Sequence, residues 1–192
     1  MKYEEASRIA DEIIRLYVQY GGAEYSGEQV TQLEHMVQAA QLARAQGYDD
    51  EVVLAAFLHD IGHIAEKLTE QNAMDGYGIR DHESIGAGFL SHRGFSHRVT
   101  RLVASHVAAK RYLTLRDTAY YNQLSEASRR TLEFQGGPMS EAEAATLEED
   151  PLFREIIQMR RWDEDAKNEN LPLPGLEPFR ELILQHLRAQ PE

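Results

Sequence analysis

Residues 52–63 read Val-Val-Leu-Ala-Ala-Phe-Leu-His-Asp-Ile-Gly-His, and this stretch decides the fold class. Its first seven residues are the densest apolar run in the chain, and the aspartates at 49–50 before it are good N-cap residues for a helix. His59 and Asp60 follow the run, where an aspartate is costly to bury unless a positive group meets it. A helix-end histidine beside a capping carboxylate is the alternative interpretation. His63 is expected one turn beyond His59 on the same helix face.

Apolar residues recur at helical spacing on both sides of this stretch, as Ala6, Ile9 and Ile13 show near the N-terminus. Ser140 with Glu143 three residues later forms a capping-box pattern. We predict helices over residues 3–19, 28–45, 50–66, 80–92, 96–110, 125–135, 150–168 and 176–189, together with one that Ser140 begins. A short β-hairpin could form only in the alternating run 112–121.

These segments predict an all-α fold of about eight or nine helices around one core. A length of 192 residues is typical of one domain. We therefore expect a single domain over residues 1–192, with its core at about residues 25–168.

Composition excludes several classes of function. The chain has no cysteine, so disulfides, thiolate nucleophiles and sulfur-bound metals are excluded. Its 20 Lys and Arg against 32 Asp and Glu give a formal net charge of −12, which argues against nucleic acid as a partner. No apolar run reaches the roughly 18 residues of a membrane span, and the acidic N-terminus does not resemble a signal peptide. We expect a cytoplasmic monomer that binds neither nucleic acid nor membrane.

Two further histidines lie at helix positions that could face the core. Val99, Leu102, Val103 and His106 occupy one apolar helix face, so His106 is expected to point into the core. A hydrogen-bonded core histidine is the alternative to a metal ligand there. His82 lies in the first turn of its helix, where an exposed polar residue is the alternative.

Asp163 shares a helix face with the apolar Ile156, and a core-facing aspartate is rare. Tyr25, Glu28 and His35 lie on one side of the segment that leads into the helix predicted over residues 28–45. A solvated polar face is the alternative interpretation of that run.

Taken together, these anomalies indicate a metal centre. Five predicted helices each supply an imidazole or carboxylate from an inward or half-inward face. Six such ligands are too many for one tetrahedral ion, but they suit two ions about 3.5–4 Å apart that share a carboxylate. Asp60 is the natural bridge, and ligands without sulfur favour iron or manganese. The six are His35, His59, Asp60, His82, His106 and Asp163.

The same residues resemble the HD-domain superfamily, and the resemblance covers nearly the whole chain. Most members of that superfamily are metal-dependent phosphohydrolases, and a smaller branch holds mixed-valent di-iron oxygenases that include the hydroxyphosphonate oxygenases. The chain is similar to this smaller branch. The matching segments are 32–35, 58–63, 82–87, 106–113, 128–139 and 161–163.

The resemblance implies roles for individual residues. His35, His59, Asp60 and Asp163 would hold one iron, and Asp60, His82 and His106 the other, as an Fe(II)/Fe(III) pair. His63, Lys110, Ser128 and Gln135 would bind the phosphonate, Tyr25 would be a removable phenolate ligand, and Glu28 would meet a cationic amine. A helix C-terminal cation is the alternative for Lys110, and a helix-surface position for Ser128 and Gln135. For Tyr25 and Glu28 the alternative is loop packing and a carboxylate at a helix N-terminus.

The implied activity is a di-iron dioxygenase of phosphonate degradation. It would use O₂ to cleave the C–P bond of a 1-hydroxy-2-aminoethylphosphonate, releasing phosphate and glycine, or glycine betaine from the N-trimethylated substrate. The sequence does not separate these two amines, because Glu28 could meet either and Tyr25 could contact a trimethylammonium by cation–π. The alternatives are an HD-type phosphohydrolase and a non-enzymatic HD binding module.

Overall fold

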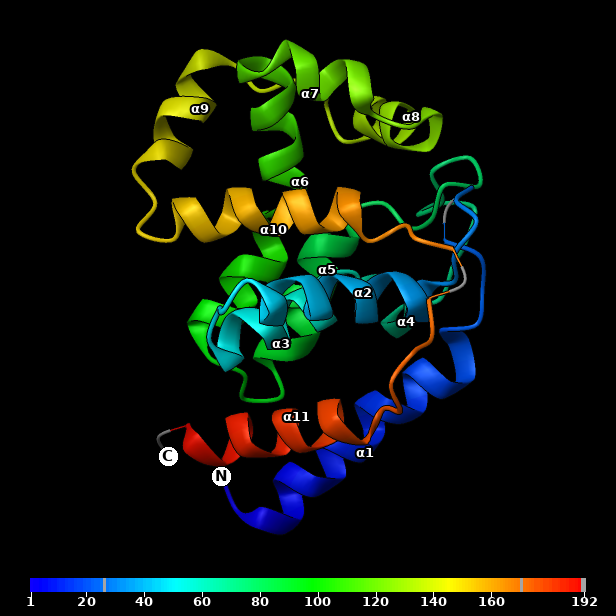
Figure 1. Ribbon diagram of the computed structural model, residues 1–192, viewed down its shortest axis with the longest axis vertical. Coiled ribbons are helices and arrows are strands. Elements are labelled where there is room, and N and C mark those ends of the chain that lie inside the picture. The colour runs from blue at the N-terminus through cyan, green and yellow to red at the C-terminus, as the bar shows by residue number, and fades with distance from the viewer. Residues whose placement is uncertain (26, 170, 191–192) are drawn as a thin grey trace.

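The computed structural model describes residues 1–192 apart from 26, 170 and 191–192, and its all-α architecture confirms the predicted fold class (Figure 1). The helices are α1 (Tyr3–Tyr20), α2 (Gln32–Ala45), α3 (Asp50–Leu58), α4 (Gly62–Ala65), α5 (His82–Ser91), α6 (His97–Arg116), α7 (Thr118–Gln123), α8 (Glu126–Phe134), α9 (Glu141–Glu148), α10 (Phe153–Asp165) and α11 (Glu177–Ala189).

Eleven helices lie within the described residues, which is more than the eight or nine expected. Two local differences account for the number. The expected helix 50–66 is split into α3 and α4, and the run 112–121 contains no hairpin. Instead, α6 continues to Arg116 and α7 follows after Asp117, whose side chain accepts a hydrogen bond from the main-chain N–H of Tyr120.

The break after α3 has a packing cause. The buried hydroxyl of Tyr17, from α1, donates a hydrogen bond of 2.6 Å to the carbonyl oxygen of Phe57. The N–H of Ile61 donates to the carbonyl of Leu58 at 3.1 Å, which closes a tight turn rather than a further α-helical turn. Asp49 caps the start of the helix as predicted. The turn therefore places His59 and Asp60 directly after the buried residues 52–58 of α3.

This break also moves His63. The prediction that His63 stands above His59 on one continuous helix face is wrong, because His63 belongs to the separate helix α4. Its ring stacks on that of His82, with centroids 4.0 Å apart.

The second helix begins later than predicted. Thr31 and Glu34 form a reciprocal capping box, so α2 starts at Gln32. Glu28 consequently lies in the loop before α2 and not on the helix face that the sequence suggested. Ser140 and Glu143 form the capping box predicted for α9.

Two loops, one between α1 and α2 and the other between α4 and α5, flank the region that holds the candidate ligands. Within the described residues, β pairing is limited to two isolated bridges, Glu24 with Thr31 and Ala73 with Ile79, one in each loop. No helix among the described residues is long and apolar enough to cross a membrane.

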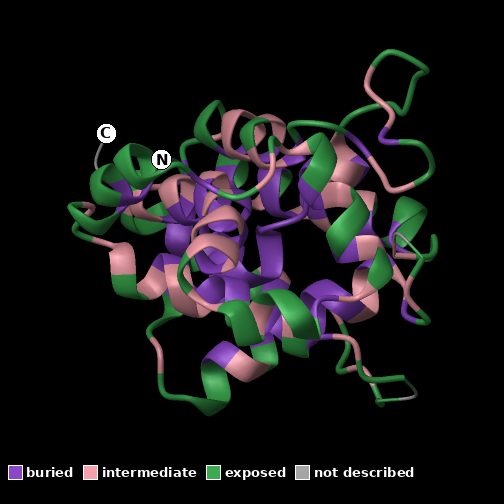
Figure 2. Cartoon of the chain, turned by 90° about the horizontal axis from the view of Figure 1, so that it is seen from above, coloured by how far each residue is buried: buried purple, intermediate pink, exposed green. Residues whose placement is uncertain are grey.

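Helix α10 crosses the middle of the molecule and packs against α2, α3 and α6 (Figure 1). Helices α1 and α11 pack against each other and cover the side of α3 that faces away from α10. Helices α7, α8 and α9 gather around the C-terminal end of α6. Buried residues concentrate at the centre, where these helices meet (Figure 2).

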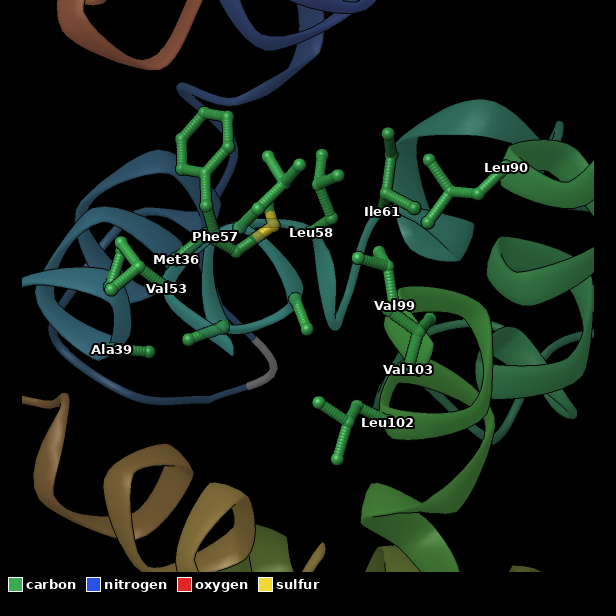
Figure 3. Close-up of a cluster of buried hydrophobic side chains, with 14 of the residues drawn as sticks. Met36, Ala39, Val53, Phe57, Leu58, Ile61, Leu90, Val99, Leu102 and Val103 are labelled. Carbon is green, nitrogen blue, oxygen red and sulfur yellow. The ribbon is translucent and has the colours of Figure 1, made fainter. Parts of the chain in front are cut away.

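The core between α3, α5 and α6 is aliphatic. Figure 3 shows Ile61 facing Leu90 of α5, with Val99 and Val103 of α6 nearby; all four side chains are buried. Burial of such side chains stabilises a fold by about 1.5–3 kcal/mol each. The candidate metal ligands therefore lie next to a close-packed apolar core.

Helices α4 and α5 approach so closely that one glycine is obligatory. A Cβ added to Gly62 would lie 2.0 Å from the main-chain oxygen of His82 and 3.0 Å from the nitrogen of Gly86. This contact sets the position of the first residue of α5, His82.

Candidate metal centre

Five parts of the chain deliver the six predicted ligands to one place: α2, the turn after α3, and the helices α5, α6 and α10. Each of the six side chains is buried, with at most 4% of its surface exposed. These are His35, His59, Asp60, His82, His106 and Asp163.

The four imidazoles form two facing pairs. The Nε2 atoms of His35 and His59 lie 3.1 Å apart, and those of His82 and His106 lie 3.0 Å apart. Each of these contacts joins two ring nitrogens that point at each other.

The other ring nitrogen of every imidazole already has a partner. Each Nδ1 lies 2.8–3.1 Å from a main-chain carbonyl oxygen, which can only accept, so Nδ1 carries the proton. A ring that is neutral then presents a bare Nε2 lone pair to its neighbour, although at His106 the contact with Asp60 outweighs burial and raises the pKa. Burial lowers the pKa of His59 to about 4, despite the opposing effect of Asp60. Facing lone pairs repel, so each pair fits a cation, and carbonyl-bound Nδ1 is the usual support of a metal-binding histidine. The carbonyls belong to Ala166, Ala56, Ile79 and Val103.

Asp60 lies between the two pairs. Its Oδ1 is 3.2 Å from Nε2 of both His82 and His106. Its Oδ2 faces the other pair, 3.6 Å from His35 and 3.5 Å from His59. That Oδ2 is buried and has no hydrogen-bond partner among the described residues. A buried carboxylate oxygen in this state fits a metal ligand, so the residues present suit two ions with Asp60 between them.

Asp163 completes the first pair. Its Oδ1 lies 3.4 Å from Nε2 of His35, while its Oδ2 forms an ion pair with Arg160. The sequence interpretation missed Arg160, which is 5% exposed and also contacts Glu164 and the Tyr120 hydroxyl. Its position one helix turn before Asp163 was the available signal, because a buried carboxylate needs a cation nearby.

His63 lies against this centre but has the geometry of a donor. The main-chain N–H of Ile79 donates to its Nδ1 at 3.1 Å, so a neutral His63 carries its proton on Nε2. Burial, followed by the neighbouring His82, holds the pKa of His63 well below its usual value. Its proton therefore makes it a hydrogen-bond donor rather than a ligand.

A small cavity of about 40 Å³ opens beside the two histidine pairs. The five residues predicted to bind substrate line it together with Tyr25, the predicted removable ligand, and Thr131, Arg160 and Lys167 line it as well. The six are Tyr25, Glu28, His63, Lys110, Ser128 and Gln135.

Lys110 is a buried lysine in the wall of this cavity. Its Nζ donates to the Thr131 hydroxyl at 2.6 Å and to Oε1 of Gln135 at 3.1 Å. Burial, with Arg160 nearby, holds the pKa of Lys110 well below its usual value. An ammonium with two neutral partners has a strong remaining demand for an anion. The third hydrogen is available for that anion.

Tyr25 covers the first histidine pair. Its ring stacks on His35 with centroids 3.8 Å apart, and its hydroxyl donates to Oδ1 of Asp163 at 3.4 Å. Burial and the nearby carboxylates raise the pKa of Tyr25 well above its usual value. The phenol is therefore protonated in this arrangement.

Glu28 already has partners. The Ser125 hydroxyl donates to its Oε1 at 2.7 Å, and Nζ of Lys167 lies 3.1 Å from the same oxygen. Burial opposes these contacts, but they hold the pKa of Glu28 below its usual value. Ser128, also assigned to the phosphonate, donates to Glu164 at 3.2 Å. Lys167 is a second residue that the sequence interpretation missed.

Comparison with known proteins places this chain in a family. The HD domain model matches residues 33–133, a span that holds five of the six candidate ligands and leaves Asp163 outside. An uncharacterized protein of Acanthamoeba polyphaga mimivirus is 40% identical over 184 residues, which cover 96% of this chain and 84% of the relative.

Two further relatives have named activities. A [1-hydroxy-2-(trimethylamino)ethyl]phosphonate dioxygenase (glycine-betaine-forming) of Leisingera caerulea is 40% identical over 163 residues, 85% of this chain and 82% of the relative. A hydroxymethylphosphonate dioxygenase of Gimesia maris is 40% identical over 170 residues, 86% of this chain and 83% of the relative. The chain therefore belongs to the HD-domain family and is a homologue of proteins named as phosphonate dioxygenases.

Proposed function

We propose that this protein is an oxygenase that uses O₂ to cleave the C–P bond of a small 1-hydroxyphosphonate at an Fe(II)/Fe(III) centre. The observation that carries the proposal is the pair of facing, carbonyl-anchored imidazole pairs with Asp60 between them. The names of two relatives at 40% identity, both phosphonate dioxygenases, support this reaction class.

One set of residues would hold the metal ions, and another set would bind the substrate. His35, His59, Asp60 and Asp163 would hold one iron, and Asp60, His82 and His106 the other. When bound, the iron pair supplies electrons for O₂ and Lewis acidity toward the substrate hydroxyl.

The cavity residues would bind and orient the substrate. The free hydrogen of Lys110 and the Nε2 proton of His63 suit phosphonate oxygens, since charge-assisted hydrogen bonds are strong. Thr131 and Gln135 hold the Lys110 ammonium in place. Tyr25 lies over His35, where it would exclude water from the first histidine pair until substrate enters.

The reaction balances without a further reductant. One C–P and one C1–H bond break, O₂ takes up four electrons, one of its oxygen atoms completes a carboxylate and the other completes phosphate. Hydroxymethylphosphonate would give formate, and the two aminated substrates predicted from the sequence would give glycine or glycine betaine.

The test is aerobic incubation of the iron-loaded protein with hydroxymethylphosphonate, 1-hydroxy-2-aminoethylphosphonate and its N-trimethylated form. We expect O₂ uptake equal to phosphate release, a mixed-valent EPR signal, and loss of both in His59→Ala but not in the exposed-site control His92→Ala. If phosphate is released from phosphate esters without O₂, the protein is a hydrolase. If no compound reacts and no metal binds, the binding-module alternative holds.

A further inference from the structure

One carboxylate in the cavity wall is available to a substrate cation. Among the described residues that line the cavity, the acids are Glu28, Asp60 and Asp163. Asp60 and Asp163 face the histidine pairs. Of these three acids only Glu28 stands away from the candidate metal ligands, so it is the carboxylate that a substrate ammonium would meet.

Lys167 already forms an ion pair with one oxygen of that carboxylate. Its Nζ lies 3.1 Å from Oε1 of Glu28 and 3.0 Å from Oε2 of Glu164. The Lys167 and Glu28 side chains are 17% and 18% exposed, so solvent screens them less than a surface pair.

The chain around Lys167 is held in place. The main-chain N–H of the next residue, Asn168, donates to Oε1 of Gln38 at 3.0 Å, and Nε2 of Gln38 donates back to the Asn168 carbonyl at 2.9 Å. Gln38 is a buried residue of α2. This two-way contact anchors the backbone next to Lys167 beside the cavity.

We propose that Lys167 determines the substrate class of this site: it supplies the cation that would otherwise come from the substrate, and the preferred 1-hydroxyphosphonate therefore has an uncharged substituent on its hydroxylated carbon. This inference rests on the proposed function. It departs from the aminated substrates predicted from the sequence, because a substrate ammonium would reach Glu28 only by lying within a few ångströms of the Lys167 ammonium. Like charges at that separation oppose each other by about 1–4 kcal/mol.

The size of the cavity points the same way. About 40 Å³ of space holds only a few water molecules. A substrate with a small neutral substituent needs less rearrangement of the loop that carries Glu28 than one with a trimethylammonium group.

The experiment compares kcat/KM for the three hydroxyphosphonates named above in the wild type and in variants at Lys167. We expect the wild type to prefer hydroxymethylphosphonate at least tenfold over both cationic substrates. Lys167→Met is expected to shift the ratio toward the cationic substrates by about tenfold, mainly through KM, which corresponds to about 1.4 kcal/mol. Lys167→Gln, which keeps a hydrogen bond to Glu28 without the charge, should shift it in the same direction. Lys167→Arg and the exposed control Lys2→Met should leave it unchanged.

A wild type that prefers an aminated substrate, with a ratio that does not respond to Lys167→Met, overturns the inference; Lys167 would then simply turn to Glu164 when substrate binds. If the wild type oxidises none of the three compounds, the proposed function fails instead. In that case, calorimetric binding of the same compounds to the metal-loaded protein decides the inference separately, because the selectivity for an uncharged substituent should still depend on Lys167.

Discussion

His82 and His106 point their Nε2 atoms at each other across 3.0 Å, while both Nδ1 atoms are engaged by main-chain carbonyls. Neither nitrogen can turn away without breaking a hydrogen bond in the core. The pair is therefore built for a cation, and the same holds for His35 and His59.

Metal removal is expected to destabilise the protein. Chelation should lower the melting temperature by several degrees, because a ligand at a hundredfold excess over its Kd stabilises the folded state by about 2.7 kcal/mol. Readdition of iron should restore it. His106→Ala should reduce the bound metal from two ions to one per chain by elemental analysis, whereas the exposed control His92→Ala should keep both. An unchanged melting temperature after complete chelation would show that the imidazole pairs are held by packing alone.

Arg160 is expected to be essential for stability because it neutralises the outer oxygen of Asp163. Arg160→Met leaves Asp163 and Glu164 without this cation, and loss of one partner of a buried ion pair costs about 3–5 kcal/mol. Urea denaturation would measure the loss. The neighbouring Arg161 is exposed, so Arg161→Met should change stability by less than about 0.5 kcal/mol. Equal effects of the two variants would contradict the assigned role, and weaker metal binding by Arg160→Lys would support it.

Gly62→Ala is expected to disturb the metal centre through the backbone. The new Cβ would meet the main-chain oxygen of His82 at 2.0 Å, so α5 must move away, at a cost of about 1–3 kcal/mol. Thermal denaturation and metal stoichiometry would both report the change. Gly88 offers a matched control on α5, because a Cβ there meets nothing within 4 Å. Gly88→Ala should stabilise the helix by about 0.5–1 kcal/mol, and the idea fails if Gly62→Ala behaves the same way.

The helix break before the metal centre is expected to depend on Tyr17. Tyr17→Phe removes the hydroxyl that donates to the Phe57 carbonyl and leaves a buried acceptor unpaired, at a cost of about 1–3 kcal/mol. Chemical denaturation would measure it, with the exposed Tyr3 as the control site for the same substitution. A Tyr17→Phe protein as stable as the wild type would mean that the turn at residues 59–61 needs no support from α1.

The positions of most candidate ligands could be predicted from the sequence. Helical periodicity assigns each residue to a face, and His106 and Asp163 fall on faces made of large apolar residues, so their burial followed from spacing alone. His59 and Asp60 close the most apolar segment in the chain, which requires them to be buried. Local patterns also predicted the all-α class and the capping box of Ser140 and Glu143, but not that of Thr31 and Glu34.

Other features depended on contacts between residues far apart in the chain. Tyr17 of α1 interrupts the helix that periodicity predicted over 50–66, and so His63 stacks on His82 instead of standing above His59. Lys167 meets Glu28 across 139 positions. A sequence pattern determines which face of a segment is buried, because that depends on neighbours one turn away. Which charge meets which carboxylate depends on how the helices pack, and only the tertiary structure decided that.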